Sequence, residues 1–354
     1  MRSVQPIRPL VVWLLAGLLA LLCVQPAAAH GYIVRAIPED RATLERAPTR
    51  VQYWFSEALE RDYSVVNVRD QSGTIIASGG VTEEDGALMR VQLPPDLPDG
   101  AYIVELRPAF ASDGHVVAES RVFFVGSEVS GVTGSAASTG AVPLEVVWRG
   151  LSLTAAMVLF GVFALYAGIL VPAWGSHKYA AGLLPPRVMT RLYWLIGGGI
   201  ALLAASSVLA LLQQAMTFFN TGIEQVITQG LWNIARIGSR FGDVWNFRMI
   251  LLVLVTALFA AALYYRRSQP VMVRPFLTAA TPVMALVLGT FSVVSHAAGS
   301  QILPWVGVIF DWLHATAVGF WIGALAAFVL VMPVALQPYA GEARRLALQI
   351  GRAS

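Results

Sequence analysis

Short alternating runs of apolar and polar residues characterise the chain from residue 30 to residue 126. Turn-forming pairs such as Ser72-Gly73 and Asp85-Gly86 separate these runs. Short strands with regular turn signals predict a small all-β sandwich over this range. The runs richest in β-branched and aromatic side chains are residues 51–55, 64–68, 101–106 and 121–125.

Long apolar stretches replace this alternation in the rest of the chain. Five of them reach the ~20 residues that a helix needs to cross hydrocarbon. They predict an α-helical transmembrane bundle over residues 144–354, joined to the β domain by a flexible linker at 127–143 that is rich in Gly, Ser and Ala. Residues 229–241 form an amphipathic stretch, for which an interfacial helix and a plain loop both stay open. The five predicted spans lie near residues 145–172, 190–215, 247–265, 275–296 and 304–333.

The N-terminus has the pattern of a secretory signal. Arg2 and Arg8 precede an apolar run at 10–24, and three alanines at 27–29 follow. This order predicts a signal peptide over residues 1–29, whose cleavage makes His30 the first residue of the mature protein. The only cysteine, Cys23, lies in the signal. Any metal bound by the mature protein must therefore use nitrogen, oxygen or thioether ligands.

Export of the β domain sets the expected topology. The first span then runs from outside to inside, and the loops predicted inside carry most of the later basic residues, which fits the positive-inside rule. We expect a multi-pass protein of the bacterial cytoplasmic membrane with its N-terminal domain on the periplasmic or extracellular side. Because the chain stops soon after the fifth predicted span, we also expect it to be C-terminally truncated. The basic residues are Lys178, Arg187, Arg266, Arg267, Arg274, Arg344 and Arg345.

Charge separates the β domain from the rest. The full chain has a net charge of +3, whereas residues 30–126 contain 15 acidic residues against nine arginines. An acidic exported domain favours a cationic ligand and argues against nucleic acid. A merely solvated acidic face is the alternative.

A first constellation of metal-binding groups consists of His30 with Asp113 and His115. An N-terminal histidine offers its α-amine and its imidazole, and in a strand residues 113 and 115 would face the same side. Three nitrogens and one oxygen suit a tetragonal Cu(II) site. The alternative is that His30 is simply the first mature residue, with Asp113 on the surface beside a histidine satisfied by other contacts.

A second constellation lies in the predicted bundle. His296 closes the fourth span, and Asp311 and His314 near the start of the fifth share a helix face. Ionisable groups within a span are costly and usually functional, so these three residues form a candidate transmembrane copper pathway. Interfacial residues satisfied by water or backbone are the alternative. The methionines of the bundle form no repeated motif, so we expect them to pack in the core or against lipid; they include Met157, Met216, Met249, Met284 and Met332.

These motifs resemble two families. His30, the run Phe55-Ser56-Glu57-Ala58-Leu59 and Asp113-Gly114-His115 are similar to the CopC copper-resistance family. That resemblance implies a cupredoxin- or immunoglobulin-like sandwich and assigns Cu(II) to His30, Asp113 and His115. Some CopC members have a second, methionine-rich Cu(I) site, which we do not expect because the domain contains only Met89.

From about residue 145 onward the chain resembles the CopD family of inner-membrane copper proteins. The motifs concerned are Ser295-His296-Ala297 and Asp311-x-x-His314, which leads to Trp321-x-Gly323. Fusion of a CopC-like to a CopD-like domain implies a role in copper uptake, homeostasis or resistance.

We therefore expect a copper-binding and transport protein, with Cu(II) bound outside and Cu(I) as a further candidate in the bundle. Expected partners are the copper ion, the lipid bilayer and periplasmic copper chaperones. The sequence contains no phosphate-binding loop, nucleophile elbow or H-E-x-x-H motif, so ATP-driven pumping has no support, and we do not expect an enzyme. Two alternatives stay open: a membrane-anchored protein that sequesters copper without transport, and a haem or copper redox protein.

Overall fold

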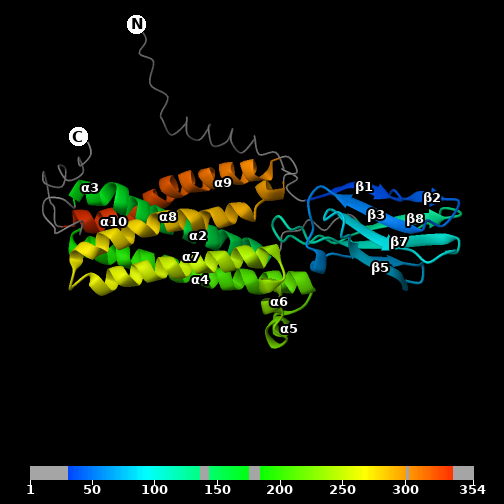
Figure 1. Cartoon of the computed structure of the whole chain (residues 1–354), viewed down its shortest axis with the longest axis horizontal. Coiled ribbons are helices and arrows are strands. Elements are labelled where there is room, and N and C mark those ends of the chain that lie inside the picture. Colours follow the sequence, from blue (N-terminus) through cyan, green and yellow to red (C-terminus); the bar gives the residue numbers. More distant parts are fainter. Residues whose placement is uncertain (1–30, 136–142, 175–183, 300–302, 338–354) are drawn as a thin grey trace, which may run out of the picture. The chain divides into compact units, whose positions relative to one another are not determined.

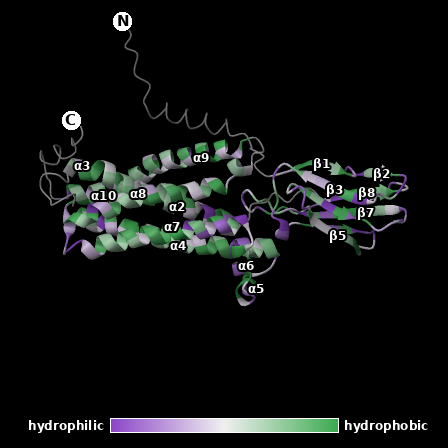
Figure 2. Cartoon of the chain, in the orientation of Figure 1, coloured by the Kyte–Doolittle hydropathy of each residue, from purple (hydrophilic) through white to green (hydrophobic). Residues whose placement is uncertain are grey.

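A computed structural model describes residues 31–135, 143–174, 184–299 and 303–337. A β-rich part is followed by a helical part (Figure 1), and the helices are mostly hydrophobic (Figure 2). This order confirms the predicted fold class of an all-β domain followed by apolar helices. The predicted signal peptide and His30 lie outside the described residues.

The strands of the β part form one hydrogen-bonded sheet in the order β1-β3-β6-β5-β4-β7-β8-β2. All neighbours pair antiparallel except β2 and β8, which are parallel. The strands therefore belong to a single curled sheet rather than to two unconnected ones. They are β1 (Ile33–Ile37), β2 (Ala42–Leu44), β3 (Arg50–Phe55), β4 (Val65–Arg69), β5 (Ile75–Val81), β6 (Leu88–Gln92), β7 (Gly100–Arg107) and β8 (Glu119–Val125).

Side-chain alternation builds the core of this sheet. On β7, Tyr102, Val104 and Leu106 are buried, and the residues between them are more exposed. They pack with buried residues of β3, β4, β6 and β8 in one apolar cluster. Tyr102 stacks on Phe123 with 5.2 Å between ring centroids. The period of two read from the sequence therefore places one face of each of these strands toward a shared interior.

The described residues of the helical part contain five helices that are long and apolar enough to cross a membrane, as predicted. They cover Leu144–Ala173, Pro186–Phe219, Arg240–Tyr265, Pro270–Val293 and Pro304–Leu336. Their elements are α2 (Pro143–Leu165), π-helical η2 (Tyr166–Leu170), α3 (Val171–Trp174), α4 (Pro186–Phe219), α7 (Arg240–Tyr265), α8 (Val273–Val293), α9 (Pro304–Val318), π-helical η6 (Gly319–Gly323) and α10 (Ala324–Leu336).

Between the second and third spans the chain forms two short helices, α5 (Ile223–Thr228) and α6 (Leu231–Ile237). The amphipathic stretch at 229–241 is thus helical over α6 and again from Arg240, where α7 begins. The Ser239 side chain accepts a hydrogen bond from the Gly242 backbone N–H and caps α7.

Small residues allow close packing within the bundle. Gly161 on α2 lies against Gly323 of η6, where a Cβ on either glycine would overlap the backbone of the other helix. Such close approach is how membrane helices associate without a hydrophobic driving force between them. Met284 is fully buried in the bundle core, and Met249 and Met332 pack against it, as predicted.

Candidate functional site

Asp113, Gly114 and His115 lie on the connection between β7 and β8, in a turn rather than in the strand that would place their side chains on one face. Gly114 has φ +74°, a conformation that glycine adopts without strain, and this turns the chain between its neighbours. The Asp113 Oδ1 atom accepts a hydrogen bond of 2.9 Å from the His115 backbone N–H. The expected strand geometry at this motif is therefore wrong, because β7 ends at Arg107 and residues 111–113 form a turn before β8 begins at Glu119.

The start of the described chain lies against this turn. Gly31, which follows His30, is so close to the Phe110 ring that a Cβ on it would overlap the ring. The Phe110 backbone N–H in turn donates to the His115 carbonyl at 2.8 Å. The attachment point of His30 is thus beside the loop that carries Asp113 and His115, although His30 itself lies outside the described residues.

The run at 55–59 holds both segments in place. The Ser56 Oγ accepts from the Tyr32 backbone N–H at 3.0 Å, and the Ser56 N–H donates to the Tyr32 carbonyl at 2.9 Å. The next residue, Glu57, accepts a hydrogen bond from the Ser112 hydroxyl. One short segment therefore fixes residues next to His30 and next to Asp113.

Polar contacts from the helical part hold the turn from its other side. Gln214 on α4 donates through Nε2 to the Gly114 carbonyl at 2.7 Å. Arg149 on α2 donates through Nη2 to the Asp113 carbonyl at 3.2 Å. Because both contacts are to the backbone, they fix the position of the Asp113 side chain without using its carboxylate.

Two charged side chains of the β part contact helix ends whose partial charge is opposite to their own. Arg107 donates to the Phe218 carbonyl at 3.1 Å and to the Thr217 carbonyl, both at the C-terminus of α4. Glu60 accepts from the Arg240 backbone N–H at 2.8 Å, at the N-terminus of α7. A cation at a helix C-terminus and an anion at an N-terminus both interact favourably with the helix dipole.

An aromatic contact also joins the β part to α4. Tyr63, in the short 3-10 helix η1 (Arg61–Tyr63), stacks on Phe218 with 4.1 Å between ring centroids. Burial, together with the nearby carboxylates of Glu60 and Asp62, raises the pKa of Tyr63 to about 12, so its hydroxyl stays protonated at neutral pH. Burial also raises the pKa of the Glu60 carboxyl, and it lowers that of the Arg107 guanidinium.

The second predicted constellation lies next to the first. His296 is in a 3-10 helix, η5 (His296–Gly299), directly after α8, and its Nδ1 is 3.6 Å from the Asp113 Oδ2. Asp113 is only 5% exposed. On α9, Asp311 Oδ2 accepts a hydrogen bond of 3.4 Å from the Ser295 hydroxyl.

One cavity of about 410 Å³ brings these groups together. Asp113 lines it with His296, Asp311 and His314, and Met157 of α2 adds a thioether. His115 is not among the lining residues. Within the described ranges, no three His, Cys, Asp or Glu side chains stand close enough to hold one metal ion. The donors therefore surround a shared space rather than form a preassembled cluster.

Two residues of this cavity were missed or set aside in the sequence analysis. Arg248 lies on α7 and is 3% exposed, with its guanidinium carbon 3.8 Å from the Phe291 ring centroid. An arginine inside an apolar span is the signal that could have identified it. Met157 packs against the bundle core as predicted, yet it also lines the cavity.

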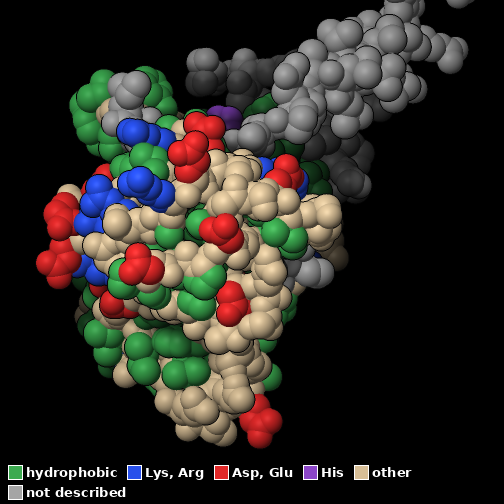
Figure 3. Space-filling view, turned by 90° about the vertical axis from the view of Figure 1, so that its right-hand side faces the viewer, with side chains coloured by type: hydrophobic (Ala, Val, Ile, Leu, Met, Phe, Trp, Pro, Cys, Tyr) green, Lys and Arg blue, Asp and Glu red, His purple; other side chains and the backbone are tan. Residues whose placement is uncertain are grey.

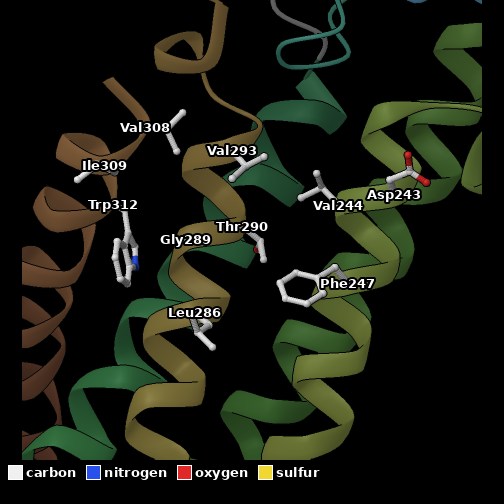
Figure 4. A pocket seen from close by; sticks show the side chains of 10 residues that line it. All are labelled: Asp243, Val244, Phe247, Leu286, Gly289, Thr290, Val293, Val308, Ile309 and Trp312. Atoms are coloured by element: carbon white, nitrogen blue, oxygen red, sulfur yellow. The ribbon is translucent and has the colours of Figure 1, made fainter. Parts of the chain in front are cut away.

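A second cavity of about 450 Å³ lies among α7, α8 and α9 (Figure 4). Its walls are almost entirely apolar, and Asp243 contributes the one carboxylate. It contains no imidazole or thioether, so its donors do not suit a copper ion. Its lining residues are Asp243, Val244, Phe247, Leu286, Gly289, Thr290, Val293, Val308, Ile309 and Trp312.

Acidic side chains are spread over the face of the molecule seen in Figure 3, and Lys and Arg side chains gather toward one side of it. Exposed ion pairs such as Arg69 with Glu105, 2.8 Å apart, neutralise part of this charge. On this face the acidic side chains are thus distributed rather than concentrated in one patch.

Comparison with known proteins shows similarity over both parts of the chain. Residues 33–126 match the CopC domain, and residues 140–301 match the family described as copper resistance protein D-like, N-terminal domain. The copper transport protein CutJ of Bacillus subtilis (strain 168) is 24% identical over 328 residues, which make up 90% of this chain and 57% of CutJ. The chain thus spans a little over half the length of this curated relative.

Solved structures resemble only the β part. CopC from Methylosinus trichosporium OB3b is 24% identical, with a TM-score of 0.26, and the match covers 28% of this chain and 99% of that protein. PcoC, a methionine-rich copper resistance protein from Escherichia coli, is 24% identical, with a TM-score of 0.24 and a coverage of 27% and 98%. Evidence for the family therefore comes from the sequence matches.

Proposed function

This chain belongs to the family of copper-resistance proteins in which a CopC domain is fused to a CopD-like membrane domain, and on that premise we propose that it captures Cu(II) outside the cytoplasmic membrane and passes copper inward. Its apolar helices are those of a multi-pass membrane protein. Copper is the cargo of this protein, and the role proposed is that of a transporter in copper uptake or resistance rather than an enzyme.

The observation that carries the proposal is the position of Asp113. This residue belongs to the β domain, yet its carboxylate lines the cavity of the bundle and lies 3.6 Å from the His296 imidazole. Asp113 is therefore the side chain at which two proposed sites meet. One is the capture site assigned to His30, Asp113 and His115, and the other is the pathway assigned to His296, Asp311 and His314.

Capture of Cu(II) is the first step. The His30 α-amine and imidazole and the His115 imidazole supply three nitrogens, and Asp113 supplies an oxygen, a donor set suited to tetragonal Cu(II). The packing of Gly31 on Phe110 supports this set, because Gly31 follows His30 in the chain and Phe110 is bonded to the turn. The backbone contacts from Gln214 and Arg149 hold that turn, whose Asp113 lines the cavity.

Passage is the second step. An ion bound by the Asp113 carboxylate can pass to the His296 imidazole, whose Nδ1 is 3.6 Å from the Asp113 Oδ2. Asp311 and His314 line the same cavity and offer the next donors. Donors that do not form a closed cluster bind an ion weakly enough to release it, which conduction requires. Periplasmic copper chaperones are proposed as the source of the ion.

Paired variants of the full chain test this function. His115→Ala should abolish tight Cu(II) binding. His296→Ala should leave that binding intact but reduce cellular copper accumulation to the level of cells without the protein. Asp113→Asn should impair both Cu(II) binding and copper accumulation. His177→Ala is the control, since this histidine lies outside the described residues and precedes Lys178 in a loop that the expected topology puts on the inner side. Wild-type copper accumulation by His296→Ala and Asp113→Asn would contradict the proposal. High copper binding without accumulation by the wild type would indicate sequestration instead.

A further inference from the structure

A buried arginine shares the cavity with the candidate copper donors. Arg248 donates through Nε to the Thr290 hydroxyl at 2.8 Å and through Nη2 to the Thr290 carbonyl at 3.3 Å. Among the described residues, no carboxylate lies within ion-pair distance of Arg248. A cation inside a membrane span is costly and is usually retained for function. Its charge is therefore available to act on an ion in the cavity.

The net charge of the cavity follows from the charged groups that line it. Asp113 and Asp311 contribute two negative charges, and Arg248 contributes one positive charge. The second lining arginine, Arg149, is paired with Glu145 at 2.7 Å, so its charge is offset locally. A histidine binds a metal ion as the neutral imidazole, so with an ion bound these groups have a net charge of about −1, which a singly charged cation neutralises.

We propose that Arg248 selects the charge of the transported ion, so that the cavity favours Cu(I) over Cu(II) and other divalent cations. Copper captured as Cu(II) must then first accept one electron per ion from an external thiol, with 2 Cu(II) and 2 RSH giving 2 Cu(I), one disulfide RSSR and two protons. This inference rests on the proposed function, and it assigns to the bundle an ion selectivity that the capture site does not have. The donors agree with it, because the Met157 thioether and the imidazoles of His296 and His314 suit a soft, singly charged ion.

The size of the effect follows from the size of the cavity. A volume of about 410 Å³ corresponds to a space roughly 9 Å across, and at an effective dielectric constant of about 20 one unit charge at that distance changes ion affinity by about twentyfold for each unit of ion charge. Removal of Arg248 leaves a net charge of about −2, which a divalent ion neutralises. A divalent ion therefore gains about twentyfold more than a monovalent ion.

The test compares Ag(I) with Zn(II), two ions that do not change oxidation state, in equilibrium binding to the purified full chain. All variants carry His115→Ala so that the capture site does not contribute. We expect Arg248→Gln to lower the ratio of Ag(I) to Zn(II) affinity by about twentyfold and Arg248→Lys to stay within about threefold of the parent. Arg236→Gln is the control, because Arg236 bonds to Asn233 and Asn246 and does not line the cavity.

Arg149→Gln provides a second route to the same change, since it leaves the Glu145 charge unbalanced, and it should shift the ratio in the same direction by a smaller factor. This variant keeps the test decisive if Arg248→Gln does not fold. An unchanged ratio in the glutamine variants that fold, or an equal fall in Arg248→Lys, overturns the role of Arg248 while the copper pathway stands. A parent that binds no Ag(I) refutes the pathway itself, and the inference falls with it.

Discussion

Replacement of Arg107 by methionine should loosen the β domain from the helices. Methionine keeps much of the apolar stem but removes the donors to the Phe218 and Thr217 carbonyls. A hydrogen bond from a charged donor contributes about 1.5–3 kcal/mol. The Thr217 carbonyl keeps a second donor, the Asn220 backbone N–H, whereas no such donor is recorded for Phe218 within the described residues. Burial also disfavours the Arg107 charge, which offsets part of the gain. The net loss is therefore about 2 kcal/mol.

Hydrogen exchange of the full chain in detergent measures this loss at the amides of residues 214–221. Arg69→Met is the matched control, because Arg69 lies on the neighbouring strand β4 and forms a partly exposed ion pair with Glu105, a type of contact that contributes about 0–1 kcal/mol. Arg107→Lys should recover part of the loss, since a lysine retains the charge but not the forked donors. Protection within about 0.5 kcal/mol of the Arg69→Met control would refute the reasoning.

Three further predictions concern single residues. Burial raises the pKa of the Glu60 carboxyl in the folded protein. The contribution of this shift to stability is therefore complete below the unfolded pKa of Glu60 and is lost as the pH rises through the raised folded pKa. Glu60→Gln should flatten this part of the stability–pH profile and unfold at a higher temperature than the wild type at pH 7. Gly114→Ala should destabilise the protein by about 1–3 kcal/mol in thermal unfolding, because Gly114 has φ +74° and the added Cβ would lie 3.0 Å from the Gln214 Nε2. Gly73→Ala is the control, since Gly73 has φ +83° but an added Cβ there would meet no neighbour. A loss no larger than that of Gly73→Ala would show that the Gln214 contact is unimportant. Gly161→Ala should prevent α2 from closing on η6 and lower the yield of folded protein in size-exclusion chromatography, whereas Gly150→Ala, whose Cβ would meet no neighbour, should behave like the wild type.

The architecture follows from local patterns that the sequence displays directly. Alternation over residues such as Tyr102, Val104 and Leu106 predicted strand β7, and long apolar runs predicted the five helices. The third helix nevertheless begins at Arg240, before the apolar run at 247, because a capped polar turn extends it. Hydropathy locates the part of a helix that is apolar, whereas its first turn depends on capping by a residue such as Ser239.

The candidate site was predictable residue by residue but not as one arrangement. Ionisable side chains in apolar segments identified His296, Asp311 and His314, and the Asp-x-His spacing identified Asp113. Their meeting in one cavity depends on contacts more than 100 residues apart in the chain, such as that of Gln214 with Gly114. Sequence periodicity contains no information on such contacts. The turn at Gly114 was also missed, since a single glycine does not reveal its φ angle.

The most direct test of the account is a determination of the N-terminal residue of the mature full chain together with the Cu(II) ligands that electron paramagnetic resonance detects in it. The account predicts a chain that begins at His30 and binds one Cu(II) with nitrogen ligands, and a spectrum that changes in Asp113→Asn and His115→Ala but not in His296→Ala. A mature chain that begins at another residue, or a Cu(II) spectrum that is the same in Asp113→Asn as in the wild type, would contradict the shared role of Asp113 on which the proposed transfer depends.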